Sequence, residues 1–448
     1  SFNVTAPMEV APGAPFDLHI AALDASANAA AYSGSVQVTA GGDTAFPPTT
    51  HEINASPATL SELRLHEPGF HRLQVVDPDH NILGVSHPVR VTENPSPVYW
   101  GELHGHSQQS DGVGTVDEHY TYARDTALLD FACVCDHDKH LYEHPDRWAY
   151  AQKKVKDYSE SGRFVAVLGY EIRTCVPETG VTRGDMNAYY RTAKGQMLGQ
   201  VDLPLDPDSL NDSNVLLVPH TPLYAEHIGM GTKWEELAEA PEHLLPVVEI
   251  FSTHGNSEYY DCPRHVLWQE TGQSVQDALK RGHRLGFIGS SDYHELLTGG
   301  LLRIQDTARA VNHQHMQARC GFAAVRAGEL TREALFDAMK TRCTYATSGI
   351  RAYLDVSING HGMGTAFALP AEDATRRIQI AAAAPQPIAK LELIRDGEVI
   401  ADLADGNWSI ESAYQDSEAL TAPVFYYVRL TTAWDDFAWS SPLWIEPS

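Results

Sequence analysis

Histidine, aspartate and glutamate residues recur in the middle of this sequence at spacings that suit metal binding. His104 and His106 are separated by one residue, and Asp292 and His294 repeat that spacing. Alternate residues of an extended segment point to the same side, so both members of each pair can reach one ion. Nitrogen and oxygen donors without a thiolate suit Zn²⁺, Mn²⁺ or Fe²⁺. The spacing therefore predicts a site for divalent metal ions.

Six apolar segments of the middle region are each followed by such residues. The segments are residues 98–100, 128–135, 164–169, 215–218, 247–251 and 285–289. The residues that follow them are, in chain order, His104 and His106, His137, Glu171, His220, His254, and Asp292 with His294. In a parallel α/β barrel the carboxyl ends of all strands meet at one end, where active sites are built. We therefore expect one cluster, which Asp111 joins from the loop after the first strand.

The fold that carries this cluster is predicted from changes in the pattern of apolar, polar and turn residues along the chain. Residues 1–97 and 350–448 contain short apolar and β-branched runs separated by turn residues, which predicts a β-sandwich domain at each end. Residues 98–349 alternate apolar strands with helical patterns at 116–126, 147–159, 275–280 and 331–339. This alternation predicts an α/β domain with a parallel sheet, of the kind that can close into a barrel.

The composition narrows the classes of partner. The chain has 59 acidic and 32 basic residues and a formal net charge of -27, which repels nucleic acid. It contains no apolar run of about 18 residues, so we expect no membrane-spanning helix and no membrane partner. The sequence as given starts without a leader pattern, so we expect a cytoplasmic protein, or a periplasmic or secreted one if a leader has been removed.

Four motifs resemble those of the PHP superfamily, named for polymerase and histidinol phosphatase domains. They are residues 100–107 (WGELHGHS) with 110–112 (SDG), residues 130–138, residues 219–220 (PH) and residues 291–294 (SDYH). The β-rich ends, together with residues 329–334 and 344–349, resemble a large, mostly uncharacterised branch of that superfamily. The resemblance implies a distorted (β/α)7 barrel flanked by N-terminal and C-terminal β-sandwich-like domains, with two or three divalent metal ions.

The resemblance also implies which residues hold each ion. The first ion would be surrounded by His104, His106, Glu171 and Asp292. The second would be held by Glu171 and His220, and the third by Asp111, His137 and His294. Members with three ions carry a further histidine between the glutamate and the third motif. Here that region reads RGDMN at residues 183–187, so either Asp185 substitutes or the second ion is weak or absent.

Together these observations predict an enzyme that hydrolyses a small molecule. Closely spaced cations lower the pKa of a bridging water, which supplies hydroxide as the nucleophile. We expect a phosphomonoester or phosphodiester as substrate, with His254 as general acid or substrate ligand. Arg173 or Arg303 could clamp an anionic substrate. Two alternatives remain open: hydrolysis of a cyclic imide or amide at the same centre, and a non-catalytic carbohydrate- or partner-binding protein.

Overall fold

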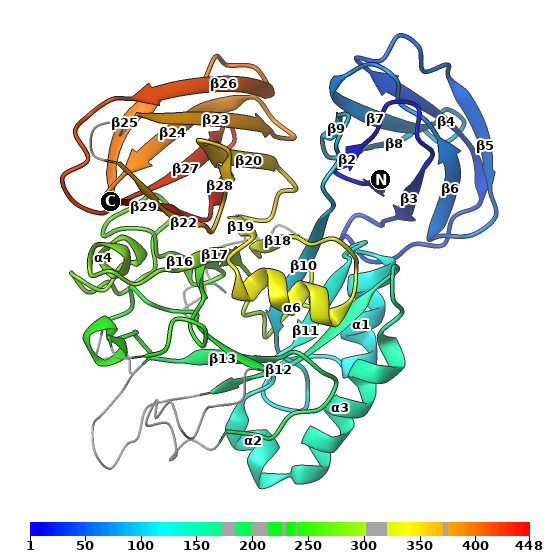
Figure 1. Ribbon diagram of the computed structural model, residues 1–448. Coiled ribbons are helices and arrows are strands. Elements are labelled where there is room, and N and C mark those ends of the chain that lie inside the picture. Colours follow the sequence, from blue (N-terminus) through cyan, green and yellow to red (C-terminus); the bar gives the residue numbers. More distant parts are fainter. Residues whose placement is uncertain (173–183, 199–213, 226–229, 239, 302–319, 371–374) are drawn as a thin grey trace.

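The structure is a computed structural model that describes residues 1–172, 184–198, 214–225, 230–238, 240–301, 320–370 and 375–448. Strands make up 42% of it and helices 12%. The two ends of the chain form β-rich parts that lie side by side, and the middle of the chain, with most of the helices, lies below them (Figure 1).

Two sheets form the N-terminal part and enclose one core. The first contains β1 (Phe2–Thr5), β3 (Phe16–Ala22) and β6 (Ala58–Leu63). The second contains β2 (Glu9–Val10), β4 (Gly34–Gly41), β5 (Thr49–Ile53), β7 (Gly69–Asp77), β8 (Ile82–Val85) and β9 (Val89–Val91). Alternate residues of β7 are buried, among them Leu73 and Val75, and Leu18 of the other sheet joins the same core. This period of two is what a sheet with one covered face requires.

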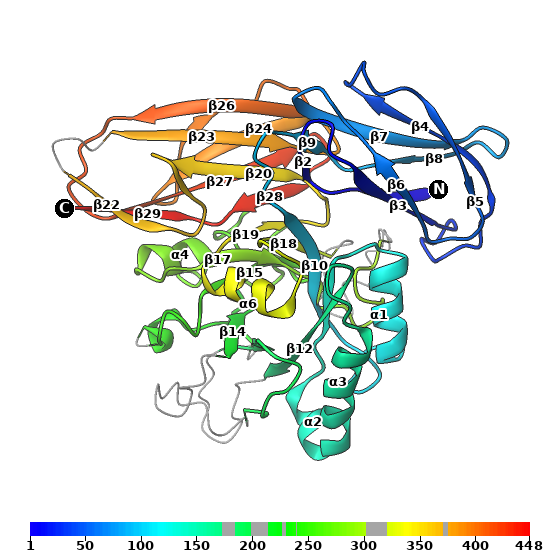
Figure 2. The same ribbon diagram turned by 45° about the vertical axis from the view of Figure 1, so that its right-hand side comes forward.

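A sheet of 13 strands runs through the middle of the molecule (Figure 2). Its first part contains β14 (Val215–Pro219), β13 (Met186–Tyr190), β12 (Val165–Ile172), β11 (Phe131–Val134), β10 (Val98–Gly105), β18 (Phe322–Arg326) and β19 (Thr344–Thr347), in that spatial order. A separate small sheet contains β15 (Val247–Ser252), β16 (Gly255–Asn256) and β17 (Gly286–Gly289).

The 13-stranded sheet continues into the C-terminal part. It takes in β22 (Ala366–Leu369), β24 (Ile388–Arg395), β25 (Glu398–Asp402), β27 (Val424–Thr432), β28 (Phe437–Ser440) and β29 (Leu443–Pro447). β19 pairs with β28, so the backbone ladder crosses the domain boundary expected at residue 349. A four-stranded sheet of β20 (Tyr353–Ile358), β21 (His361–Gly362), β23 (Arg376–Ala383) and β26 (Ser409–Asp416) completes this part.

The helices that the sequence predicts form where expected. They are α1 (Val116–Asp125), α3 (Pro145–Tyr158), α4 (Val275–Lys280) and α6 (Arg332–Lys340), and the short α2 (Asp138–Glu143) precedes α3. A capping box of Thr115 and Glu118 starts α1, and one of Ser274 and Asp277 starts α4. No helix in the described part of the chain is both long and apolar enough to cross a bilayer.

The expected distorted (β/α)7 barrel is wrong, because the fold is β-rich and its described residues form only five α-helices. In the middle region β10, β11 and β12 are parallel neighbours, as are β15 and β17. β13 is antiparallel to both of its neighbours, and β18 is antiparallel to β10 and β19. Antiparallel neighbours need no helical crossover, which accounts for the low helix content.

Candidate metal centre

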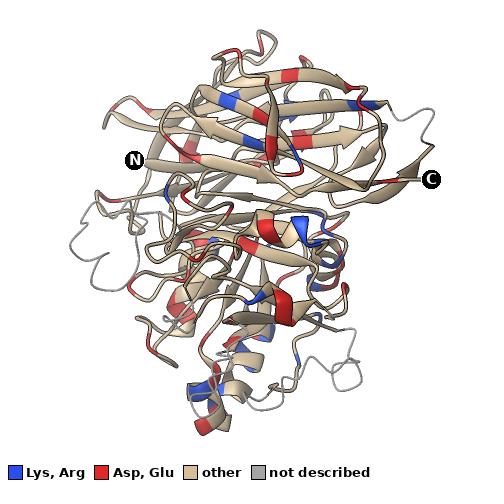
Figure 3. Cartoon of the chain, turned by 90° about the vertical axis from the view of Figure 1, so that its left-hand side faces the viewer, with Lys and Arg blue, Asp and Glu red and all other residues tan. Residues whose placement is uncertain are grey.

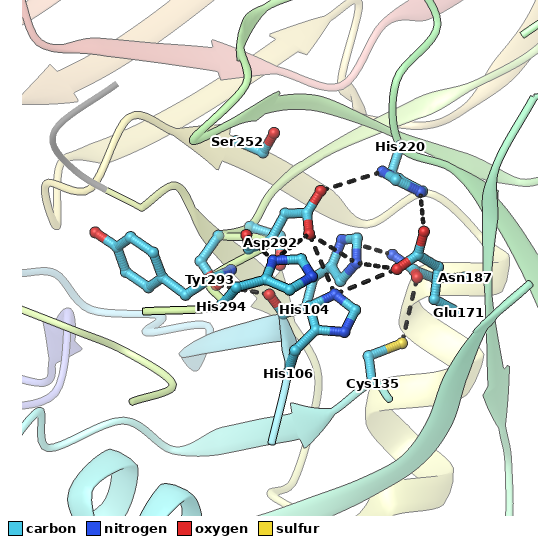
Figure 4. Close-up of polar contacts among 12 residues, drawn as sticks. His104, His106, Cys135, Glu171, Asn187, His220, Ser252, Asp292, Tyr293 and His294 are labelled. Atoms are coloured by element: carbon cyan, nitrogen blue, oxygen red, sulfur yellow. Dashed lines mark hydrogen bonds and ion pairs between the residues drawn. The ribbon is translucent and has the colours of Figure 1, made fainter. Parts of the chain in front are cut away.

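The strand ends bring the candidate ligands together, and Figure 4 shows the centre of the resulting cluster. β10, β11, β12 and β14 run in one direction, so His104, His137, Glu171 and His220 lie at or just beyond the same ends. The segment after β17 joins them through backbone contacts. The Asp292 N–H donates to the His104 carbonyl at 2.6 Å, beside a parallel bridge between Gly105 and Tyr293.

Glu171 lies among four imidazoles and is 1% exposed. Its Oε2 is 3.0 Å from His137 Nδ1, 3.2 Å from His106 Nε2 and 3.5 Å from His104 Nε2. Its Oε1 is 3.2 Å from His220 Nε2. One carboxylate thus faces four nitrogens, an arrangement in which it can bridge more than one cation.

Asp292 is the second carboxylate at the centre. Its Oδ1 is 3.1 Å from His106 Nε2, and its Oδ2 is 2.6 Å from His254 Nε2. Its backbone has φ of 61°, in the left-handed region that few residues other than Gly adopt, although Asp and Asn enter it more readily. Such backbone strain persists where the surrounding structure holds it and is concentrated at functional sites.

Asp111 forms the solvent-facing edge of the cluster. Its Oδ1 is 3.4 Å from His137 Nε2 and 3.3 Å from His294 Nε2. The side chains of Asp111 and His294 are 45% and 22% exposed, whereas the other cluster members in the described residues are buried. The loop is tight here, since a Cβ on Gly112 would lie 2.0 Å from the His106 carbonyl oxygen. Solvent therefore reaches the cluster from the Asp111 side.

The carboxylates and imidazoles of the cluster shift one another's pKa. Burial raises the pKa of the Glu171 carboxyl, but His137 and His220 outweigh burial and hold that pKa well below its usual range. Burial also raises the pKa of Asp292, but His104 lowers it by more, so the pKa of Asp292 lies well below its usual range. Burial lowers the pKa of His104, yet Asp292 brings it well above the ordinary value. Without cations, the imidazoles that face these carboxylates are the groups that can take up compensating protons.

The donor set fits divalent cations. Four overlapping groups have ligand atoms within 4.8 Å of one another. The groups are His106, Asp111, His137 and His294; His104, His106, Glu171 and Asp292; His104, His220 and Glu249; and Glu171, Asp185 and His220. Both ring nitrogens of His137 lie within ion-pair distance of carboxylates but make no hydrogen bond, and Nδ1 of His106 is buried without a hydrogen-bond partner in the described part of the chain. Converging imidazoles and carboxylates of this kind suit Zn²⁺, Mn²⁺ or Fe²⁺.

All eight residues predicted as metal ligands fall within these groups. Asp185 joins them because β13 is antiparallel to β12, so the start of β13 at Met186 lies beside the end of β12 at Ile172. His254 lies outside the four groups but contacts Asp292 and, through Nδ1, the Tyr224 hydroxyl at 2.8 Å. Arg173 and Arg303 lie outside the described residues.

Three neighbours of the cluster were not predicted: Glu249, Asn187 and Tyr224. Glu249 lies 3.2 Å from His104 Nδ1, and Asn187 lies 2.9 Å from the same atom. Sequence reasoning treated residues 247–251 only as an apolar strand. A single glutamate inside that strand was the signal that could have identified Glu249, because a buried charge needs a partner.

Comparisons with known proteins give relatives but no activity. The family described as "Protein of unknown function (DUF3604)" matches residues 298–360, a segment that contains none of the eight candidate ligands. An uncharacterised protein of Chlamydia pneumoniae is 26% identical over 410 residues, and others from Chlamydia trachomatis and Chlamydia muridarum are 26% and 25% identical. Each alignment covers 86% of this chain and 64% of the relative, so the chain spans about two thirds of their length.

Two solved structures show only weak similarity. An engineered protein aligns with 51% of this chain and 48% of its own at 12% identity and a TM-score of 0.15. The β-glucuronidase 3 of Bacteroides uniformis, in its apo form, aligns with 100% of this chain and 63% of its own at 9% identity and a TM-score of 0.20. Scores this low say nothing about the fold or the function of this chain.

Proposed function

We propose that this protein is a metal-dependent hydrolase that acts on small phosphoesters. The observation that carries the proposal is the convergence of eight buried or half-buried His, Asp and Glu side chains from distant parts of the sequence. A cluster of buried charges is costly unless its members are compensated, and cations would compensate the carboxylates here. The resemblance of the four motifs to the PHP superfamily supports the same activity.

The chain's own residues would hold the ions and present the substrate to them. Glu171 would lie between ions, and the group with Asp111 and His294 would face the incoming substrate because it is the exposed edge. Divalent ions at such a site lower the pKa of bound water and polarise the substrate oxygen. The buried members, such as His104, would fix the ions against displacement.

His254 is the candidate proton donor, and its surroundings define its tautomer. The ionised carboxylate of Asp292 can only accept, so the His254 nitrogen 2.6 Å from it, Nε2, carries a proton. In the neutral ring Nδ1 is then an acceptor, and the Tyr224 hydroxyl donates to it at 2.8 Å. To act as a general acid, His254 would carry a proton on both nitrogens, with Nδ1–H donating to the Tyr224 oxygen. The Nε2 proton would then pass from Asp292 to the leaving group and leave a neutral ring protonated on Nδ1.

A small substrate fits the charge of the protein better than a nucleic acid. The net charge of -27 repels polyanions, and Asp and Glu residues are spread over both the sheets and the helices in the view of Figure 3. Small phosphoesters remain accessible because bound cations would neutralise their charge locally.

Hydrolysis of a cyclic imide or amide is the second candidate, and one observation favours it. Within the described residues, the ion-pair partners of the cluster carboxylates Asp111, Glu171, Glu249 and Asp292 are all histidines, with no Lys or Arg among them. A neutral carbonyl substrate needs no such cation, and a metal-bound nucleophile attacks carbonyl carbon as well as phosphorus.

Metal analysis and a substrate screen test the proposal. The protein is produced in medium supplemented with Mn²⁺, Zn²⁺ or Fe²⁺, its metal is counted by elemental analysis, and phosphomonoesters, phosphodiesters and cyclic imides are assayed with Asp292→Asn as control. More than one ion per chain and phosphoester turnover that the control lacks are expected. Trace metal only, with no activity restored by any of these ions, would refute the proposal; turnover of imides alone would favour the second candidate.

A further inference from the structure

Glu249 is a fully buried carboxylate behind one of the candidate ligands. It lies in the middle of β15 between the apolar Val248 and Ile250, and neither its side chain nor that of His104 is exposed. Its Oε2 is 3.2 Å from His104 Nδ1, while its Oε1 has no hydrogen-bond partner. Burying a carboxylate is unfavourable unless a partner compensates it. The ring of His104 is the partner that the structure provides.

The two nitrogens of His104 face different surroundings. Nε2 faces Glu171 and Asp292 at 3.5 and 3.7 Å, on the side of the cluster, and Nδ1 faces Glu249 and Asn187. An imidazole that binds a cation through Nε2 carries its proton on Nδ1. Glu249 lies where it can accept that proton, and such a carboxylate fixes the ring and makes the ligand nitrogen more basic.

In the described part of the chain the other cluster imidazoles do not face a carboxylate outside the cluster in this way. Nδ1 of His106 is buried there without a hydrogen-bond partner, and Nδ1 of His220 lies 3.8 Å from Asp292, a member of the cluster. Asn187 adds to the contact on His104 through Nδ2, 2.9 Å from Nδ1, while its Oδ1 accepts from Cys135 Sγ at 3.2 Å. When Nδ1 carries the proton, rotation of the amide would bring Oδ1 to the ring and Nδ2 to the sulfur. His104 is thus the ligand held on its outer side by a charged group and an amide.

We propose that Glu249 is a positioning residue that orients His104 and strengthens its binding of a divalent cation. This inference rests on the proposed metal-dependent function, but it concerns metal affinity rather than turnover. Loss of a carboxylate in this position lowers metal affinity about 10–100-fold in comparable sites. Replacement by Gln keeps the shape and an acceptor oxygen but removes the charge that holds the Nδ1 proton.

The test measures dissociation constants for Zn²⁺ and Mn²⁺ by competition with a chelating dye, in the wild type, Glu249→Gln and Glu102→Gln. Glu102 is the matched control: it is also a buried carboxylate, but its Oε1 accepts from the His104 backbone N–H at 2.5 Å and does not contact the ring. At least one ion should bind about 10–100-fold more weakly in Glu249→Gln and near the wild-type level in Glu102→Gln.

The metal-free Glu249→Gln variant should melt close to the wild type, because His104 keeps Glu171 and Asp292 as partners. Unchanged affinity in this variant would overturn the inference, and so would equal losses in both variants, which would indicate overall charge rather than the ring contact. Complete loss of one ion would also overturn it, because Glu249 would then be a ligand of the group with His104 and His220. If Glu249→Gln fails to fold, Glu249→Asp should fold and bind more weakly, and wild-type affinity there would overturn the inference. A wild type that binds neither ion would instead refute the proposed function itself.

Discussion

Removal of bound cations should lower the thermal stability of the protein by a large and reversible amount. The group of His106, Asp111, His137 and His294 and the group of Glu171, Asp185 and His220 share no residue, so two ions can bind side by side. An ion present at 100 times its Kd stabilises the folded state by about 2.7 kcal/mol, so two contribute about 5 kcal/mol. The middle and C-terminal parts share one sheet and one core, so about 350 residues unfold together. With an unfolding entropy of about 2.1 cal/mol/K per residue, 1 kcal/mol changes Tm by roughly 1–2 °C, which predicts a fall of roughly 5–10 °C.

The assay compares thermal unfolding, followed by circular dichroism, before and after dialysis against a chelator. Mn²⁺, Zn²⁺ or Fe²⁺ is then added back at increasing concentration, and Tm should rise with the logarithm of that concentration. Asp292→Asn is the matched variant and should respond much less, because it lacks a carboxylate that contacts His106 and His254 directly. A stripped wild type whose Tm none of these ions changes would refute the reasoning, since no folded-state site would then exist.

Three further results are expected. Asp292→Asn should abolish turnover but keep the native circular dichroism spectrum, because Asn also tolerates the positive φ; wild-type turnover would show that Asp292 is not a ligand. His254→Ala should slow an alkyl ester about 10²–10⁴-fold and a p-nitrophenyl ester much less, with a smaller effect in the same direction for Tyr224→Phe; equal losses on both esters would indicate positioning of the substrate, and loss of metal would make His254 a ligand. The metal-free protein should be most stable near about pH 5–6 in urea titrations. Glu171 has a lowered pKa in the folded state, so its contribution to stability is lost as the pH falls through that folded-state pKa. His104 has a raised pKa in the folded state, so its contribution is lost as the pH rises through that folded-state pKa. A urea midpoint that increases steadily toward acid pH would contradict this.

Local patterns explain which elements could be predicted from the sequence. α1 and α4 were placed correctly because their periodicity and capping residues lie within the helix itself or next to it. Four strands of the middle region, β13, β16, β18 and β19, were not predicted, and each pairs antiparallel with its neighbours. The direction of a strand depends on its partners in space, which its own residues do not encode. The barrel was therefore predicted because the sequence pattern indicated the parallel strands and missed the antiparallel ones, which are incompatible with it.

The cluster was more predictable than the fold because its members share one local signal. His137, His220 and Asp292 each follow an apolar strand, and the structure brings them together although the sheet around them is mixed. Glu249 lacked this signal because it stands inside its strand, where the alternation of side chains decides which face it occupies. The sequence therefore predicted residues at strand ends, and the supporting residues within strands required the structure.

The ladder between β19 and β28 has a consequence for producing residues 98–349, which carry the candidate metal centre, as a separate fragment. A fragment ending at residue 349 would leave Tyr345, Ala346 and Thr347 without their partners Ser440, Trp439 and Ala438. The backbone donors and acceptors of that strand would then form an open edge, which is a template for aggregation through pairing with other chains. The fragment would also leave the buried Glu258 without Arg429, which pairs with it at 2.8 Å. The C-terminal strands thus cover the edge of β19. If the shortened protein is insoluble, the exposed edge would explain it without any defect in the candidate metal centre.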